Sequence, residues 1–144
     1  MTSLFRRIVV AAIVSVAMAT AAARADVSDS DRTAIRSVIE GQIAAFQRDD
    51  GAAAYSYAAP MIQRIFPTVD AFMAMVRGGY QPVYRPQSVI FGEVVDTALG
   101  PVQRVFVTGP DGRNWVAMYS LEQQPDGTWR ITGCRLVEAS GDTA

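Results

Sequence analysis

The 144-residue sequence lacks two residue types entirely and has very little of a third. It contains no histidine and no lysine, and Cys134 is its only cysteine. Without histidine the chain has no Ser-His or Cys-His dyad, no histidine general base and no histidine metal ligand. One cysteine cannot form a disulfide within the chain. These absences exclude several common catalytic and metal sites, and we expect no metal and no other cofactor.

The charge is nearly balanced, because 13 arginines stand against 14 acidic residues and give a formal net charge of −1. A nucleic-acid binder would instead carry a basic stripe, so no nucleic-acid partner is expected. Half of the residues are hydrophobic, which excludes a disordered chain. The length is enough for one domain and too short for two.

Residues 1–25 have the features of a cleaved export signal. Arg6 and Arg7 form a short basic region, an apolar run follows over residues 8–19, and Ala23-Arg24-Ala25 has the A-x-A form that signal peptidase cleaves. The run is shorter than the roughly 20 residues that span a bilayer. We predict cleavage after Ala25 by an ordinary secretory route, with twin-arginine export as the alternative. The protein would then be periplasmic or secreted and free of the membrane.

Residues 26–144 are predicted to form a single α+β domain with frayed ends near 26–29 and 139–144. Helical spacing of apolar residues predicts a long helix over residues 30–50, with Gly51 as its C-terminal cap. Capping residues and prolines predict three shorter helices, over residues 52–58, 60–66 and 69–77. Two prolines then favour an extended path over residues 80–86.

From residue 87 onward the apolar period changes to two, which predicts strands over residues 88–95, 102–108, 114–122 and 128–138. The turns between them are short and rich in Gly and Pro, so the strands should form an antiparallel meander. Gly92 and Gly133 are predicted bulges that curl the sheet. Alternation predicts that one face of the third strand carries Trp115, Ala117, Tyr119 and Leu121. It predicts that one face of the fourth carries Trp129, Ile131, Gly133 and Arg135. A long helix and short helices before a curled meander resemble the NTF2-like or cystatin-like cone, a two-layer α+β architecture.

Several segments resemble the bacterial family called domain of unknown function 4864. The most specific segment is Tyr80-x-Pro82-Val83-Tyr84-Arg85-Pro86-x-Ser88. The others are Ile39-x-x-Gln42-x-x-Ala45-Phe46, Ala58-x-Pro60, Phe72-x-x-Met75-Val76, Trp115-x-Ala117-x-Tyr119 and Gly127-x-Trp129-Arg130-Ile131-x-Gly133-Cys134. The resemblance covers about residues 35–136. It implies a small exported bacterial protein with no established activity and, in fold, a relation to NTF2-like proteins.

Four residues are candidates for ligand binding. Gln42 lies on the apolar stripe of the long helix, where a buried amide needs a partner. Arg85 could bind a carboxylate or phosphate, with Tyr80 and Tyr84 as aromatic walls. The alternative for Gln42 is a hydrogen bond to nearby backbone, and the alternative for Arg85 is a set of backbone carbonyls that fix the helix-to-sheet crossover.

Glu93 is the candidate for a catalytic base. It alternates with Val89, Phe91 and Val95, and a carboxylate on that apolar face would have a raised pKa. A bulge at Gly92 would instead turn Glu93 toward solvent. In the last strand, Cys134 has no histidine to activate its thiol, so a small buried hydrophobe is favoured over a reactive group.

Three functions are compatible with these residues. The leading interpretation is a non-catalytic domain that binds a small molecule or a periplasmic protein in or beside its cone. The second is a homodimer formed through the exposed sheet face, which requires a contiguous apolar patch there. The third is a cofactor-free lyase or isomerase that uses Glu93 with a tyrosine. The choice among them depends on the site, because one fold hosts many functions.

Overall fold

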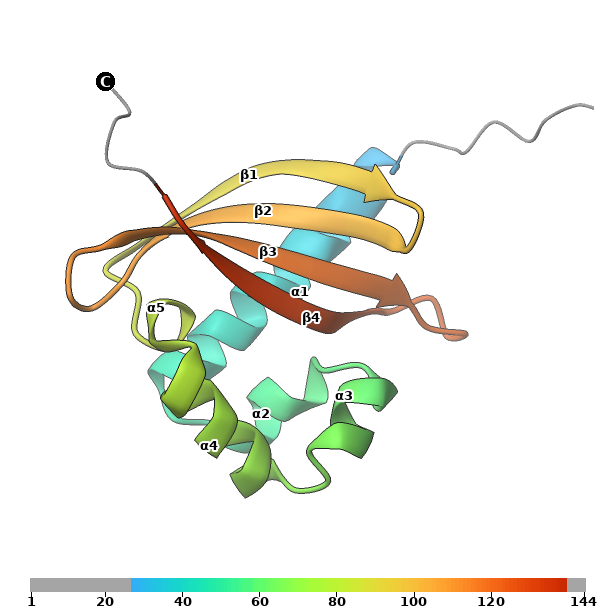
Figure 1. Cartoon of the computed structure of the whole chain (residues 1–144). Coiled ribbons are helices and arrows are strands. Elements are labelled where there is room, and N and C mark those ends of the chain that lie inside the picture. Colours follow the sequence, from blue (N-terminus) through green and yellow to red (C-terminus); the bar gives the residue numbers. More distant parts are fainter. Residues whose placement is uncertain (1–26, 140–144) are drawn as a thin grey trace, which may run out of the picture.

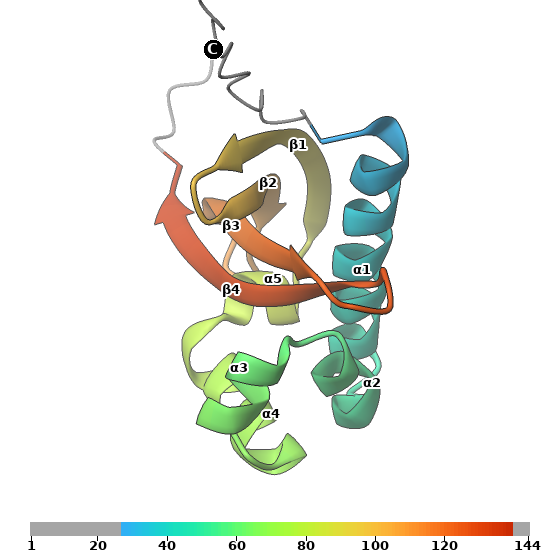
Figure 2. The ribbon, with the colours of Figure 1, turned by 90° about the vertical axis from the view of Figure 1, so that its right-hand side faces the viewer.

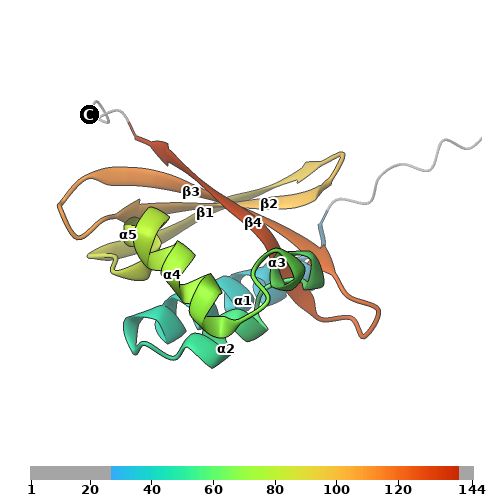
Figure 3. The same ribbon diagram turned by 60° about the horizontal axis from the view of Figure 1, so that its bottom comes forward.

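The computed structural model describes residues 27–139 (Figure 1), and the predicted export signal and its cleavage site lie outside them. The helices are α1 (Asp29–Gln47), α2 (Gly51–Ser56), α3 (Pro60–Ile65), α4 (Val69–Gly79) and α5 (Gln81–Tyr84). The strands are β1 (Ser88–Thr97), β2 (Gly100–Thr108), β3 (Asn114–Gln123) and β4 (Trp129–Glu138). They form one antiparallel sheet in the order β1-β2-β3-β4, with the helices on one side of it (Figure 3). The predicted α+β meander is confirmed.

Helix α1 begins and ends through specific backbone contacts. The Ser28 hydroxyl accepts a hydrogen bond from the Asp31 backbone N–H at 3.1 Å and so caps the first turn. The helix ends at Gln47, before the predicted residue 50, because Asp49 adopts a left-handed φ of 56°. The next helix is capped by the Asp50 side chain, so Gly51 is the first residue of α2 and the prediction that it caps the long helix is wrong.

The segment before the sheet is more helical than its prolines suggest. Helix α4 continues through Gly79, and residues 81–84 form α5 where the sequence predicted an extended path. Pro82 is compatible with this short helix because it lies in the first turn, where a backbone N–H has no partner within the helix. The Tyr80 carbonyl accepts from the N–H groups of Val83 and Tyr84, both at 3.0 Å.

Two bulges curl the sheet without closing it (Figure 2). The β1–β2 register shifts between Phe91 and Val94, at the predicted Gly92 bulge. The β3–β4 register shifts where Ser120 pairs with Gly133 and Leu121 pairs with Ile131. This second shift reverses the alternation along β4.

The reversal corrects the predicted alternation of β4. The alternation of the sequence placed Gly133 and Arg135 on the same face as Trp129 and Ile131. Instead, Cys134 and Leu136 pack against the core together with Trp129, whereas Arg135 is exposed. A bulge shifts every following side chain to the opposite face, so strict alternation fails beyond it.

The core lies between α1 and the concave face of the sheet (Figures 1 and 2). The apolar stripe of α1 is buried as predicted, and inward-facing residues of β2, β3 and β4 cover it. The largest fully buried side chains are Tyr119, Phe46, Ile35, Ile39, Leu121 and Val105. The short helices α2 to α5 extend this core below one end of the sheet, where the candidate site lies.

Candidate functional site

A partly open cavity with a volume of about 190 Å³ lies between the sheet and the helices α1, α3 and α4. Its walls are mainly apolar and include Phe46 from α1, Ile62 from α3, Val76 from α4 and Ile131 from β4. None of the described side chains that line it is charged. Engineered apolar cavities of about 150 Å³ bind benzene, so this volume suits one small molecule.

Gln42, one of the four candidates for ligand binding, lies at this cavity. Gln42 is only 4% exposed, and its Nε2 donates to the Ala54 carbonyl at 3.2 Å. The predicted hydrogen bond to nearby backbone is therefore present. Gln42 thus anchors α1 to α2 and also brings a polar group to the cavity wall.

Tyr80, Tyr119 and Cys134 also line the cavity. Burial raises the pKa of the Tyr119 hydroxyl well above its ordinary value, and the neighbouring Cys134 adds to this. Burial likewise raises the pKa of Tyr80, and it raises the pKa of the Cys134 thiol to about 12. All three groups are therefore uncharged near neutral pH. The Tyr119 hydroxyl is buried beside the Cys134 thiol, and a hydrogen bond between them adds to the raised pKa of Tyr119 and partly offsets the rise for Cys134.

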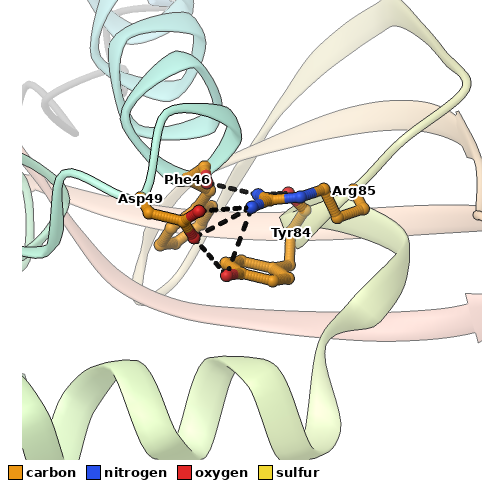
Figure 4. Close-up of polar contacts among 4 residues, drawn as sticks. All are labelled: Phe46, Asp49, Tyr84 and Arg85. Atoms are coloured by element: carbon orange, nitrogen blue, oxygen red, sulfur yellow. Dashed lines mark hydrogen bonds and ion pairs between the residues drawn. The ribbon is translucent and has the colours of Figure 1, made fainter.

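Tyr84 and Arg85 do not line the cavity and form a separate cluster with Asp49 (Figure 4). Arg85 Nη2 donates to both carboxylate oxygens of Asp49, at 2.9 and 2.8 Å, and Nη1 donates to the Phe46 carbonyl. The Tyr84 hydroxyl donates to the same carboxylate. These hydrogen bonds, first from Tyr84 and then from Arg85, lower the pKa of Asp49.

The cluster corresponds to the structural alternative for Arg85. Its guanidinium lies over the Tyr84 ring, with 4.1 Å from Cζ to the ring centroid, and joins the end of α1 to α5. Both terminal nitrogens are already used, Nη2 by the Asp49 carboxylate and Nη1 by the carbonyls of Phe46 and Tyr84. Of the four ligand candidates, the structure brings Gln42 and Tyr80 to one cavity and places Tyr84 and Arg85 in this cluster.

Glu93 lies on the β1 bulge and points to solvent. Its side chain is 71% exposed and forms an ion pair with Arg104, with Nη1 and Oε1 3.4 Å apart. The bulge at Gly92 reverses the alternation, as the alternative interpretation required. The burial that a carboxylate base would need is absent, and Glu93 is not among the residues that line the cavity.

Sequence analysis missed two polar residues of the cavity, Tyr119 and Cys134. The alternation of Ala117, Tyr119 and Leu121 did place Tyr119 on the inner face of β3, which the structure confirms. Its hydroxyl was the available signal, because a tyrosine on a fully buried face needs a partner for that group. Cys134 was expected to be a small buried hydrophobe, and it packs against the core; its place at the cavity depends on the β4 bulge, which the alternation did not include.

Comparison with known families decides the membership of the chain. The family model described as a domain of unknown function, DUF4864, matches residues 28–144. The chain belongs to the DUF4864 family. This confirms the family resemblance predicted from the sequence motifs. Searches of curated proteins and of solved structures each found no match.

Two further properties of this DUF4864 chain concern residues 27–139. Within them, no three His, Cys, Asp or Glu side chains are grouped so that they could hold a metal ion. None of the helices in the same range has the length and apolar character needed to cross a membrane.

Proposed function

We propose that this DUF4864 domain is a non-catalytic binding module that holds one small, mostly apolar molecule in the cavity beneath β4. The observation that carries the proposal is a cavity of about 190 Å³ walled mainly by apolar side chains. Covering apolar surface is favourable by roughly 25 cal/mol per Å², so a molecule that fills this space gains affinity from its walls.

The chemistry of the lining favours binding over catalysis. A general acid or base works best with a pKa near the operating pH. The titratable groups at the cavity are Tyr80, Tyr119 and Cys134, and burial raises the pKa of each away from neutrality. Glu93, the carboxylate considered for this role, is exposed and lies elsewhere.

The proposal includes the setting in which the domain works. The basic region, apolar run and A-x-A motif of residues 1–25 support export from a bacterial cell and a periplasmic or secreted location. A relation to NTF2-like proteins is supported by the long helix α1 against a curled four-stranded meander. In such an arrangement a pocket at the end of the cone is a natural place for a ligand.

The test is a calorimetric titration of residues 26–144 with toluene, a probe of suitable size. We expect saturable 1:1 binding by the unaltered domain. Ile62→Trp places a larger side chain at the cavity wall and should weaken binding at least tenfold. Ile65→Trp makes the same change three residues along α3 at a side chain that is 61% exposed, and it should bind toluene normally.

Two results contradict the proposal. One is the absence of saturable binding to the unaltered domain at toluene concentrations near its solubility. The other is equal weakening of binding in Ile62→Trp and Ile65→Trp, which would locate the effect in α3 stability and not in the cavity.

A second candidate function is homodimer formation through the outer sheet face. Register pairs Ile90 with Phe106, Phe106 with Val116, and Val116 with Val137, so these four side chains form one row across the sheet. Ile90, Phe106 and Val137 are exposed. A contiguous apolar patch of this kind is typical of an interaction surface.

A second copy of the chain is the partner that this face suits. The neighbouring positions carry both signs of charge, with Arg104 and Glu93 adjacent to the apolar row. A two-fold interface requires a patch that complements itself, and mixed charges beside an apolar row allow this. In sedimentation experiments at about 100 µM, we expect a dimer that Phe106→Arg converts to a monomer and Leu99→Arg, in the exposed β1–β2 turn, does not. A monomeric unaltered domain at this concentration would exclude the dimer.

A further inference from the structure

A second hollow, a groove with a volume of about 340 Å³, lies between the N-terminal half of α1 and the edge strand β1. Its lining includes Arg32, Thr33 and Arg36 of α1, Phe91 and Val94 of β1, and Gln103 of β2. None of the residues that line this groove also lines the apolar cavity. A ligand in the groove is therefore independent of the binding function proposed above.

The β1 bulge decides which side chains face the groove. The register shifts between Phe91 and Val94, so Gly92 and Glu93 together stand opposite one residue of β2. Glu93 lines the groove, but its carboxylate pairs with Arg104, which does not line it. This carboxylate is therefore already neutralised by a cation outside the groove.

Two arginines one turn apart supply positive charge to the groove. Arg32 and Arg36 are four residues apart on α1, so their side chains are neighbours on the helix surface. The Arg32 guanidinium has no ion pair and no hydrogen bond with any residue between 27 and 139. Arg36 Nε donates to Glu40 Oε1 at 2.7 Å, which leaves Nη1 and Nη2 for another acceptor. The three side chains together carry one surplus positive charge.

The groove also offers apolar surface next to these charges. The Arg36 guanidinium lies over the Phe91 ring, with 4.6 Å from Cζ to the ring centroid, and this cation–π contact holds it beside β1. Phe91 is partly buried against the core, and Val94 lies beyond the bulge on the same wall. A molecule whose charged group meets the arginines can therefore place an apolar body against β1.

We infer that this groove binds a small organic monocarboxylate with an apolar body. Guanidinium groups match the geometry of a carboxylate and can bind it through two parallel hydrogen bonds. One negative charge balances the one surplus positive charge. A phosphate monoester carries close to two negative charges at neutral pH and would also meet repulsion from Asp29 and Asp31 in the first turn of α1.

Benzoate and benzamide test this inference, because they have nearly the same shape and differ in charge. In a titration followed by methyl NMR, benzoate should shift the signals of Val94 in a saturable manner and leave those of Val76 and Ile131, at the cavity, in place. Benzamide should bind in the groove at least fivefold more weakly. Benzoate binding should also weaken as salt is added, because the arginines are exposed.

Three variants identify the groups responsible. Arg32→Gln and Arg36→Gln should each weaken benzoate binding about fivefold, the upper range for an exposed ion pair, and change benzamide binding less than twofold. Glutamine is a helix former comparable to arginine, so α1 should be retained. Arg77→Gln removes the same charge from an exposed position of α4 that does not line the groove, and benzoate affinity should stay unchanged.

Several results would overturn the inference. Val94 signals that do not shift in a saturable manner with benzoate would remove the site, and equal binding of benzamide would remove the role of charge. Equal weakening by Arg77→Gln would reduce the effect to the overall charge of the domain. Tighter binding of phenyl phosphate than of benzoate would overturn the choice of a monocarboxylate. Toluene binding at the cavity is unaffected by any of these outcomes.

Discussion

Asp49 illustrates how a single residue connects distant parts of this domain. It has a left-handed φ of 56°, ends α1, and receives hydrogen bonds from Tyr84 and Arg85, which are 35 and 36 residues further along the chain. Asp and Asn tolerate this backbone conformation better than most residues. The same carboxylate therefore sets both the direction of the chain after α1 and the position of α5.

The lowered pKa of Asp49 makes its contribution to stability depend on pH. The folded state binds the proton less readily than the unfolded state, whose carboxyl has its ordinary value of 3.8. The stabilisation is therefore complete well above pH 3.8 and is lost as the pH falls through this value and below. Asp49→Asn keeps a residue suited to the backbone and removes the charge. Its urea midpoint should be lower than that of the unaltered domain at pH 7, and the difference should shrink toward pH 2.5.

The matched variant for this measurement is Asp96→Asn, at an exposed carboxylate of β1. It should change the urea midpoint little at either pH. A deficit of Asp49→Asn that stays constant from pH 7 to pH 2.5 would show that the carboxylate charge is not the cause.

The Cys134 thiol should react slowly with thiol reagents in the folded domain. Burial raises the pKa of its thiol to about 12 from an ordinary value of 9.0. At pH 8 this lowers the thiolate fraction about 1000-fold, and the thiolate is the reactive form. We expect a disulfide reagent to modify Cys134 at least 100-fold more slowly in the folded domain than in urea. Comparable rates in the two states would contradict the burial of this thiol.

At the scale of elements, the sequence patterns predicted most helices and strands because they depend on local spacing. Apolar residues at three- and four-residue steps placed α1, and Thr68 and Asp50 marked the starts of α4 and α2 through side-chain caps that the structure contains. The strands followed from the change to a period of two. The errors have local causes: Pro82 is accepted in the first turn of α5, and the β4 bulge reverses the facing of Cys134 and Arg135.

The candidate site was less predictable, because it depends on contacts between distant segments. Gln42 was suggested by its place on an apolar stripe, and that argument is local. Arg85 pairs with Asp49, which lies 36 residues earlier in the chain, so its guanidinium is not free to bind a ligand. No rule based on local spacing predicts this pairing. The cavity itself is the volume left over after all side chains are packed, so it cannot be read from any one segment.

Two glycines give opposite expectations for the same substitution. Gly127 in the β3–β4 turn has a φ of +85°, which side chains disfavour, whereas Gly78 in α4 has open space around the position of a Cβ. Gly127→Ala should lower the free energy of unfolding by about 1–2 kcal/mol. Gly78→Ala should raise it by up to about 1 kcal/mol, because alanine favours the helix. Urea unfolding measures both, and a stabilising Gly127→Ala would contradict the turn geometry.

At the scale of the whole molecule, the sheet separates two surfaces. Its concave side packs on α1 (Figures 2 and 3). The cavity lies on this side near α3 and α4, whereas the opposite side carries the row of Ile90, Phe106 and Val137. A ligand in the cavity and a second copy on the outer face would not compete for space. The two proposals can therefore be tested separately on the same preparation.

The central claim is that the cavity is a binding site, and methyl NMR spectra recorded during a toluene titration test it most directly. The probe should shift the methyl signals of Ile62, Val76, Val83 and Ile131, which line the cavity, in a saturable manner. The methyl signals of Ile90 and Val137 on the outer face should stay in place. Shifts confined to Ile90 and Val137, or no saturable shifts at the cavity, would contradict the claim.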